Sequence, residues 1–244
     1  MMKVRLNGAL IALAIVTTAL ILANAVTSVS RRSNNISVTG LGSQSFSSDL
    51  IVWSGEFTRK NLSLRDAYAQ LDADREAIRK YLLGKGLKAE NLVFSAVEIN
   101  KEFDEVYDDN GNRVRADFTG YKLSQKVEVE SREVDKVEAI SRTVSELINT
   151  GIEFYSSSPE YYYTKLAELK VEMIAAATRD ANIRAQKIAE NAGSTLGRLK
   201  NAEMGVFQIV AENSAEDFSW GGSFNTTSKR KTANITVRLN YETD

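Results

Sequence analysis

The chain has 244 residues, of which 43% are hydrophobic and 26% are charged, a balance typical of a globular protein. It contains no cysteine and no histidine, which excludes disulfides, metal sites built on thiolate or imidazole, cysteine nucleophiles and catalytic triads with a histidine base. Its 31 basic and 32 acidic residues leave a net charge of −1, so bulk charge does not indicate nucleic-acid binding.

Residues 1–32 carry the clearest targeting signal. They begin with basic residues, continue as an uncharged, largely apolar run over residues 6–29, and close with a pair of arginines. The run is long enough for a membrane-spanning helix, which needs about 20 apolar residues. It also contains a small-x-small site ending at Ala25, where a secretory signal peptide would be cleaved. The length of the run and the arginines behind it favour an uncleaved anchor. In both cases we expect the remaining chain to lie outside the cytoplasm.

The next part of the chain predicts strands followed by a helix. Residues 36–40 alternate and are β-branched like a strand, and Gly40-Leu41-Gly42 is expected to end it. Residues 50–57 predict a second strand. Helical periodicity follows over residues 63–83, with Ser63 as a candidate N-cap and glycines after the last turn.

A long β-hairpin is predicted over about residues 92–130. Alternating runs begin at Val93 and end at Val129, and Asn110-Gly111 lies between them. Asn-Gly between alternating runs is a strong hairpin signal, because both residues tolerate the positive φ of a tight turn. The runs are long enough that we expect the hairpin to project beyond the body of the domain.

The longest periodic segment outside the N-terminus covers residues 164–197. Apolar residues recur there at steps of three and four, which predicts a helix with one small, closely packing face. Thr164 is a candidate cap at its start and Gly193 a candidate stop. The expected buried face consists of Leu169, Met173, Ala176, Ala177, Ala181, Ala185, Ile188 and Ala192. Around this helix we expect another helix over residues 133–150 and strands over residues 152–155, 199–210 and 232–241, whereas residues 211–230 have no periodicity.

The fold class follows from this succession. The order β-β-α-β-β-α-β-α-β-β predicts an α+β protein with mainly antiparallel sheets and helices on one face, preceded by an N-terminal hydrophobic helix. We place the domain at residues 36–242, after the anchor or signal segment.

Three segments of this domain resemble the SIMPL domain family, also called DUF541. Residues 36–42 with Asp49 are similar to its opening motif, and residues 231–237 to its last strand. Residues 181–197 fit the family pattern dA..RA..iA...G..LG. The resemblance implies an α+β domain in a bacterial envelope protein, periplasmic or membrane-attached. It also implies that some members assemble into ring- or barrel-like oligomers, and it carries over no catalytic residues.

Candidate contact residues lie in the aperiodic segment and at the hairpin tip. Phe218, Trp220 and Phe224 stand among glycines within residues 211–230. Exposed, they would form a surface for a partner, a ligand or a second subunit; folded back, they would cover the core of the sheet. Together with Asn110-Gly111 at the hairpin tip, they are the residues for which we predict contacts between chains.

Metal-binding and enzymatic interpretations have less support. Part of a calcium loop is matched by Asp108, Asn110, Gly111 and Asp117, but its first ligand position is Val106 and no helix flanks it. A glycosidase acid and base would have to come from Glu98, Glu102, Asp104 and Glu105, although carboxylates are common on exposed hairpins. We therefore predict no catalytic residues, no cofactor and no metal.

The sequence predicts a non-enzymatic, exported cell-envelope protein that acts through self-association or partner binding. We expect residues 6–29 to hold it in the inner membrane, with the domain on the periplasmic side. A homo-oligomer is expected, with or without a further protein partner, and nucleic acid is not expected as a ligand. The alternative function is that of a carboxylate-based enzyme acting on envelope carbohydrate.

Overall fold

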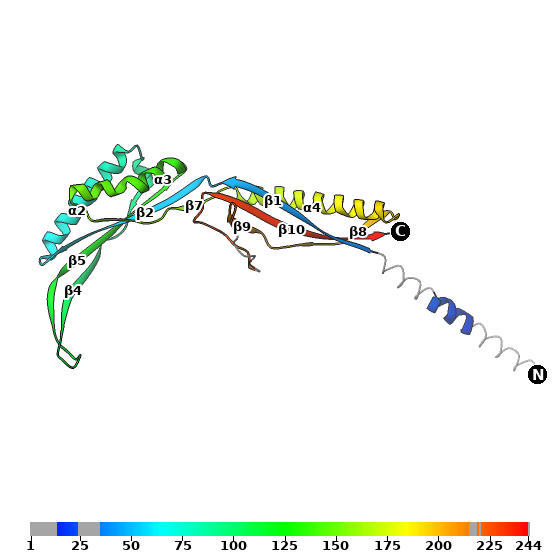
Figure 1. The fold of residues 1–244 in the computed structure, drawn as a ribbon, viewed down its shortest axis with the longest axis horizontal. Helices are drawn as coiled ribbons and strands as arrows, with labels where there is room; N and C mark the ends of the chain where they lie inside the picture. Colours follow the sequence, from blue (N-terminus) through cyan, green and yellow to red (C-terminus); the bar gives the residue numbers. More distant parts are fainter. Residues whose placement is uncertain (1–13, 24–34, 215–218, 220, 244) are drawn as a thin grey trace, which may run out of the picture.

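The computed structural model describes residues 14–23, 35–214, 219 and 221–243 of the chain. This part has the predicted α+β architecture, with its strands in two antiparallel sheets. The sheets lie end to end in an elongated molecule, and each carries its helices on one face (Figure 1). We name the two halves the α4 lobe and the α2 lobe after their longest helices.

The α4 lobe is built on the sheet formed by both ends of the domain. β1 (Asn35–Ser47) and β8 (Leu196–Met204) flank β10 (Arg230–Thr243), and β9 (Gln208–Ala211) pairs with the first part of β10. Asn35 pairs with Glu242, so the start of β1 lies beside the end of β10. α4 (Leu166–Asn191) runs along one face of β1 and β10.

Alanines bring α4 close to β1. Its buried residues follow one another at steps of four: Leu169, Met173, Ala177, Ala181, Ala185 and Ala189. A Cβ on Gly40 would clash with the α4 backbone at Ala177 and Ala181. The prediction that β1 ends at Gly40-Leu41-Gly42 is therefore wrong: the glycines make room for the helix, and the strand continues to Ser47. Ile188 and Ala192 are exposed, because a face that advances by four residues rotates around a helix of 3.6 residues per turn.

The α2 lobe contains the second sheet, in the order β3-β5-β2-β6. β2 (Leu50–Asn61) and β5 (Arg113–Ser131) are central and pair with each other. β3 (Leu92–Phe94) and β4 (Glu98–Tyr107) pair with β5. β6 (Phe154–Ser156) and β7 (Glu160–Tyr162) pair with β2. The helices of this lobe are α2 (Leu64–Gly84), α3 (Val134–Thr143) and the 3₁₀ turns η1 (Ala89–Asn91) and η2 (Val144–Thr150). The expected strand beginning at Val93 is thus divided into β3 and β4.

Local sequence signals set the helix ends of this lobe. The hydroxyl of Ser63 accepts a hydrogen bond from the amide of Asp66, as the N-cap prediction requires. Gly151 has a φ of +80° and ends η2. Arg59 of β2 donates to both carboxylate oxygens of Asp74 in α2 and, at 2.9 Å, to the carbonyl of Gly151. This single side chain ties α2 and the end of η2 to the sheet.

Hydrogen bonds and ion pairs join the two lobes. Asp49, between β1 and β2, accepts hydrogen bonds from the amide and the hydroxyl of Thr164, both at 2.7 Å. Thr164 is therefore bonded at the junction between the lobes and does not cap α4. Lys165 occupies the N-cap position of α4 and makes no side-chain hydrogen bond there. Lys229, just before β10, forms ion pairs with Asp135 and Glu138 of α3.

Candidate interaction surfaces

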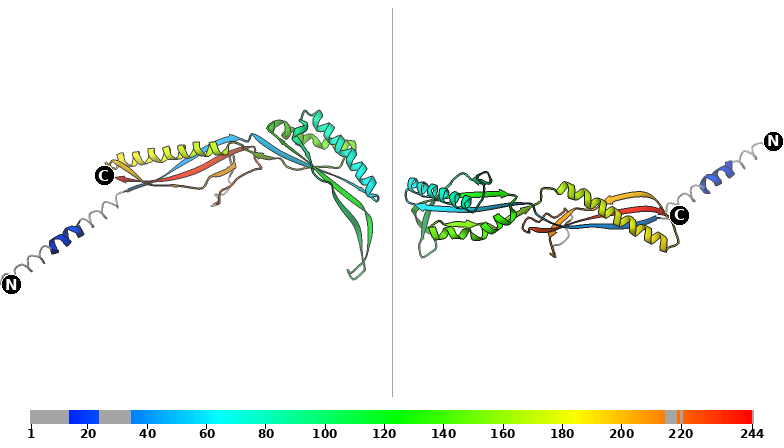
Figure 2. Two further views of the ribbon diagram at one scale, coloured as in Figure 1. Left: turned by 180° about the vertical axis from the view of Figure 1, so that it is seen from behind. Right: turned by 90° about the horizontal axis from the view of Figure 1, so that it is seen from above.

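A two-stranded ribbon extends from the α2 lobe beyond its helices (Figure 2). It consists of β4 and the first part of β5, residues 98–121, and we call it the arm. Every residue of β4 is exposed or half-buried. The exposed apolar and aromatic side chains of the arm are Ile99, Phe103, Val106, Tyr107, Val114 and Phe118.

The arm ends in the tight turn expected at Asn110-Gly111. Gly111 has a φ of +80°, and its amide donates to the carbonyl of Asp108 at 3.0 Å. The Asp108 carboxylate accepts from the amides of Asn110 and Asn112 at 3.0 and 2.8 Å. Hydrogen bonds from Asn112, more than the one from Asn110, lower the pKa of Asp108. The side chain of Asp108 thus stabilises the turn, and Asp117 lies away from it, in β5 opposite Asp104.

One face of the arm is an aromatic surface that continues from the core of the α2 lobe. It starts at the buried Leu123. Phe103 pairs across the strands with Phe118, and their ring centres are 5.6 Å apart. Phe118 and Tyr121 follow at 5.1 Å. A bulge at Thr119 allows Phe118 and Tyr121, three residues apart, to share this face.

Opposite charges flank the aromatic rings along β4. The ammonium of Lys101 lies 6.0 Å from the centre of the Tyr121 ring. Glu105 accepts a hydrogen bond from the Tyr107 hydroxyl and one from Arg113 at 2.7 Å. These two interactions, the Tyr107 hydrogen bond first, lower the pKa of Glu105, so it is ionised at neutral pH.

The carboxylates of β4 are divided between the two faces of the arm. Glu98, Glu102 and Asp104 share the face opposite the aromatic rings, whereas Glu105 lies with the rings, since successive residues of a strand point to opposite sides. Glu102 pairs with Lys60 at 2.7 Å. The four side chains that were candidates for a glycosidase pair are therefore not gathered on one surface.

The described part of the segment after β9 is folded against β9. Ile209 donates to the carbonyl of Ser223 at 2.8 Å and accepts from the amide of Asn225 at 3.0 Å. Phe224 is nevertheless 46% exposed, and its ring centre lies 6.4 Å from that of Tyr162. Phe218 and Trp220 lie outside the described residues, so the predicted contacts of these aromatic side chains stay predictions.

Comparison with protein families identifies the domain. The family model described as SIMPL, protein of unknown function (DUF541), matches residues 36–240, which include both lobes and the arm. The chain belongs to the SIMPL family. The resemblance carried by the sequence motifs is thereby confirmed. A comparison with curated proteins found no match.

The SIMPL domain also holds a buried lysine that its motifs did not single out. Lys231 of β10 is 1% exposed, donates to the carbonyl of Tyr161 in β7, and lies 5.5 Å from the centre of the Phe224 ring. Burial lowers the pKa of Lys231 to about 8. The signal was present in the sequence, because Lys231 extends the alternation of Ala233 and Ile235 by one step toward the core.

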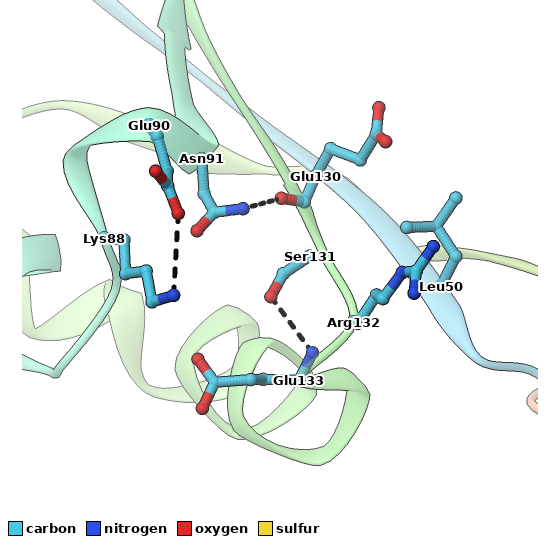
Figure 3. Close-up of a pocket in the computed structure, with 8 residues that line it drawn as sticks. All are labelled: Leu50, Lys88, Glu90, Asn91, Glu130, Ser131, Arg132 and Glu133. Atoms are coloured by element: carbon cyan, nitrogen blue, oxygen red, sulfur yellow. Dashed lines mark hydrogen bonds and ion pairs between the residues drawn. The ribbon is translucent and has the colours of Figure 1, made fainter.

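A polar depression of about 520 Å³ lies at the edge of the α2 lobe (Figure 3). Its lining contains both Lys88 and Arg132 and several glutamates, and Lys88 faces Glu90 at 3.5 Å. Ser131 accepts a hydrogen bond from the amide of Glu133 at 3.0 Å. Basic and acidic side chains both line this depression, and some of them, such as Lys88 and Glu90, pair with each other. The lining therefore favours neither an anionic nor a cationic ligand.

The segment before the SIMPL domain is helical over residues 14–23, and the rest of the anchor predicted at residues 6–29 lies outside the described residues. None of the helices in the described ranges combines the length and the apolar character needed to cross a membrane.

Proposed function

We propose that this SIMPL-domain protein is a non-enzymatic component of the bacterial cell envelope that acts through self-association or partner binding. In this proposal, residues 6–29 anchor the chain in the inner membrane and the SIMPL domain lies on the periplasmic side. The long uncharged run behind a basic start supports the anchor.

The arm is the observation that carries the proposal. A ribbon of only two strands is marginally stable in water, because neither of its faces is fully covered. The rings of Phe103 and Phe118 are nevertheless 50% and 41% exposed on it. Covering such side chains with another protein surface is favourable, and projecting apolar surfaces commonly mark interaction sites.

The segment after β9 offers a second contact. Phe224 is exposed beside Tyr162 at the junction of the lobes, and its backbone is held in place by Ile209. Phe218 and Trp220 belong to the same short segment. We propose that these aromatic residues contribute to the same assembly or bind its partner.

The mass of the full-length chain in solution tests the proposal, with mild detergent present where the chain is membrane-bound. We expect an assembly larger than a monomer, or a protein that co-purifies in fixed ratio. Replacing Phe103 and Phe118 with Ser should lower that mass without changing the melting temperature, since neither ring belongs to a core cluster.

Two further variants complete this experiment. Replacing Phe218, Trp220 and Phe224 with Ser tests the second contact in the same way. Val171→Ser removes a side chain of α4 that is 67% exposed and serves as the matched control. A chain that stays monomeric at every concentration and retains no protein would contradict the proposal.

A further inference from the structure

We propose that the arms of two copies of this chain pack face to face about a two-fold axis, with Lys101 of each copy against Glu105 of the other. The partner of the aromatic face is therefore a second copy of the chain. This inference rests on the self-association proposed above and specifies its surface and symmetry.

The surface is the aromatic face of the arm. Along β4 it presents Ile99, Lys101, Phe103, Glu105 and Tyr107, because alternate residues of a strand share a face. Their partners across the ribbon are, in the same order, Leu123, Tyr121, Phe118, Ala116 and Arg113. The Phe103–Phe118 pair lies at the centre of this series.

This face is complementary to itself. A two-fold axis through the central pair, directed across the strands, lays β4 of one copy on β4 of the other in the opposite direction. Lys101 then stands opposite Glu105 of the second copy, and Glu105 opposite its Lys101. On β5 the same operation places the large side chain of Tyr121 against the small one of Ala116, in both directions.

Lys101 and Glu105 cannot neutralise each other within one chain. They are four residues apart on a strand, a separation of about 13 Å. Among the described residues Lys101 has no ion pair, and its ammonium lies over the Tyr121 ring. Glu105 accepts from Arg113 and Tyr107, but a carboxylate has about four acceptor positions and can take a lysine as well.

The opposite face of the arm lacks this complementarity. There Asp104 stands directly across from Asp117, and Glu98 and Glu102 lie on the same side. Only Glu102 and Asp117 of these carboxylates have an ion pair among the described residues, with Lys60 and Arg115. Two copies that met through this face would bring like charges together, which disfavours that arrangement.

A charge exchange between two chains tests the contact. Lys101→Glu and Glu105→Lys are made separately in the full-length chain, each with its own affinity tag. Either variant alone places like charges at both sites across the axis, so we expect its self-association to weaken by at least about tenfold. In a mixture of the two variants both sites carry opposite charges again. Affinity capture of one variant through its tag should then retain the other variant.

The matched controls lie on the opposite face of the same ribbon. Lys122→Glu and Asp104→Lys make the same changes of charge there and should leave association unaltered. Glu105→Lys also breaks the contact between Glu105 and Arg113 within its own chain, and a second chain cannot restore that contact. Recovery of association in the mixture would therefore come from the charges between chains.

The two-fold contact is overturned if both single variants associate like the unmodified chain. It is equally overturned if the mixture stays dissociated while both variants keep their melting temperatures. Neither result would contradict self-association itself, because that is measured separately on the unmodified chain. An unmodified chain that is monomeric but retains another protein would overturn the two-fold contact alone. One that is monomeric and retains no protein would also contradict the proposed function.

Discussion

Lys231→Met removes an ammonium group of β10 that is held almost completely out of water beside β7. Lys231 is 1% exposed, and its ammonium donates to the carbonyl of Tyr161. Burial lowers its pKa from the ordinary value of 10.5 to about 8. Met has a similar length and no charge, so the variant keeps most of the packing and removes the buried charge together with its hydrogen bond to Tyr161.

The sign of the effect follows from where the proton binds. Between pH 8 and pH 10.5 the unfolded chain holds the Lys231 proton more tightly than the folded chain, so the free energy of unfolding rises with pH. Below pH 8 the cost of the buried charge is present in full, and above pH 10.5 it is absent. The difference between the two pKa values corresponds to about 3 kcal/mol. Losing the hydrogen bond to Tyr161 offsets about 1–2 kcal/mol, so the variant should gain about 1–2 kcal/mol at pH 7.

Urea unfolding of both chains between pH 7 and pH 10.5 measures this effect. The difference in stability between variant and unmodified chain should change by about 3 kcal/mol in favour of the unmodified chain as the pH rises. Lys229→Met is the matched control: its partners Asp135 and Glu138 raise the pKa of Lys229, so the loss it causes stays constant over this range. A difference that does not change with pH for Lys231→Met would refute the reasoning, because Lys231 would then titrate alike in both states.

Three other outcomes are expected. Ala181→Leu should cost about 1–3 kcal/mol in chemical unfolding, since Ala181 is fully buried against β1; an unchanged midpoint would mean that α4 can move away from the sheet. Arg59→Met should cost about 3–5 kcal/mol, because it leaves the carboxylate of Asp74, 8% exposed, without its ion pair; a loss below 1 kcal/mol would place this pair among ordinary surface pairs. Cell fractionation with N-terminal sequencing should find residues 6–29 in the membrane-bound protein, and a soluble product that begins at Val26 would contradict the anchor.

Features that depend on neighbouring residues in the sequence were predictable. Ser63 caps α2 through a residue three positions away, and Gly193 ends α4 with a φ of +69°. Asn110-Gly111 marks the hairpin turn for the same reason, since its geometry is fixed within five residues by Asp108 and Asn112. In each case the physical cause of the structure lies within one turn of chain.

Features that depend on distant residues were not predictable. Gly40 resembles a strand end until α4, more than a hundred positions later, is seen to occupy the space of its missing side chain. Thr164 resembles a helix cap, but its hydroxyl and amide donate to Asp49, which lies between β1 and β2 more than a hundred positions earlier. Alternation places Lys231 on the buried side of β10, but its contacts with Tyr161 in β7 and with the Phe224 ring depend on distant segments.

The aromatic face of the arm shows how far one local irregularity reaches. With regular alternation, Phe118 and Tyr121 would point to opposite sides of β5, because they are three residues apart. The bulge at Thr119 adds one residue to β5 and turns Phe118 back to the face of Tyr121. Gly120 next to it has a φ of +136° and lies against the carbonyl of Asn61, where a side chain would clash. The end of β2 therefore leaves no space for a side chain at position 120, beside the bulge. Gly120→Ala should therefore shift the pairing of β4 with β5 between the bulge and the hairpin turn, and move Phe118 to the face that carries Glu98, Glu102 and Asp104. If the two-fold contact is correct, this substitution, which changes neither Lys101 nor Glu105, should weaken association as strongly as reversing either charge.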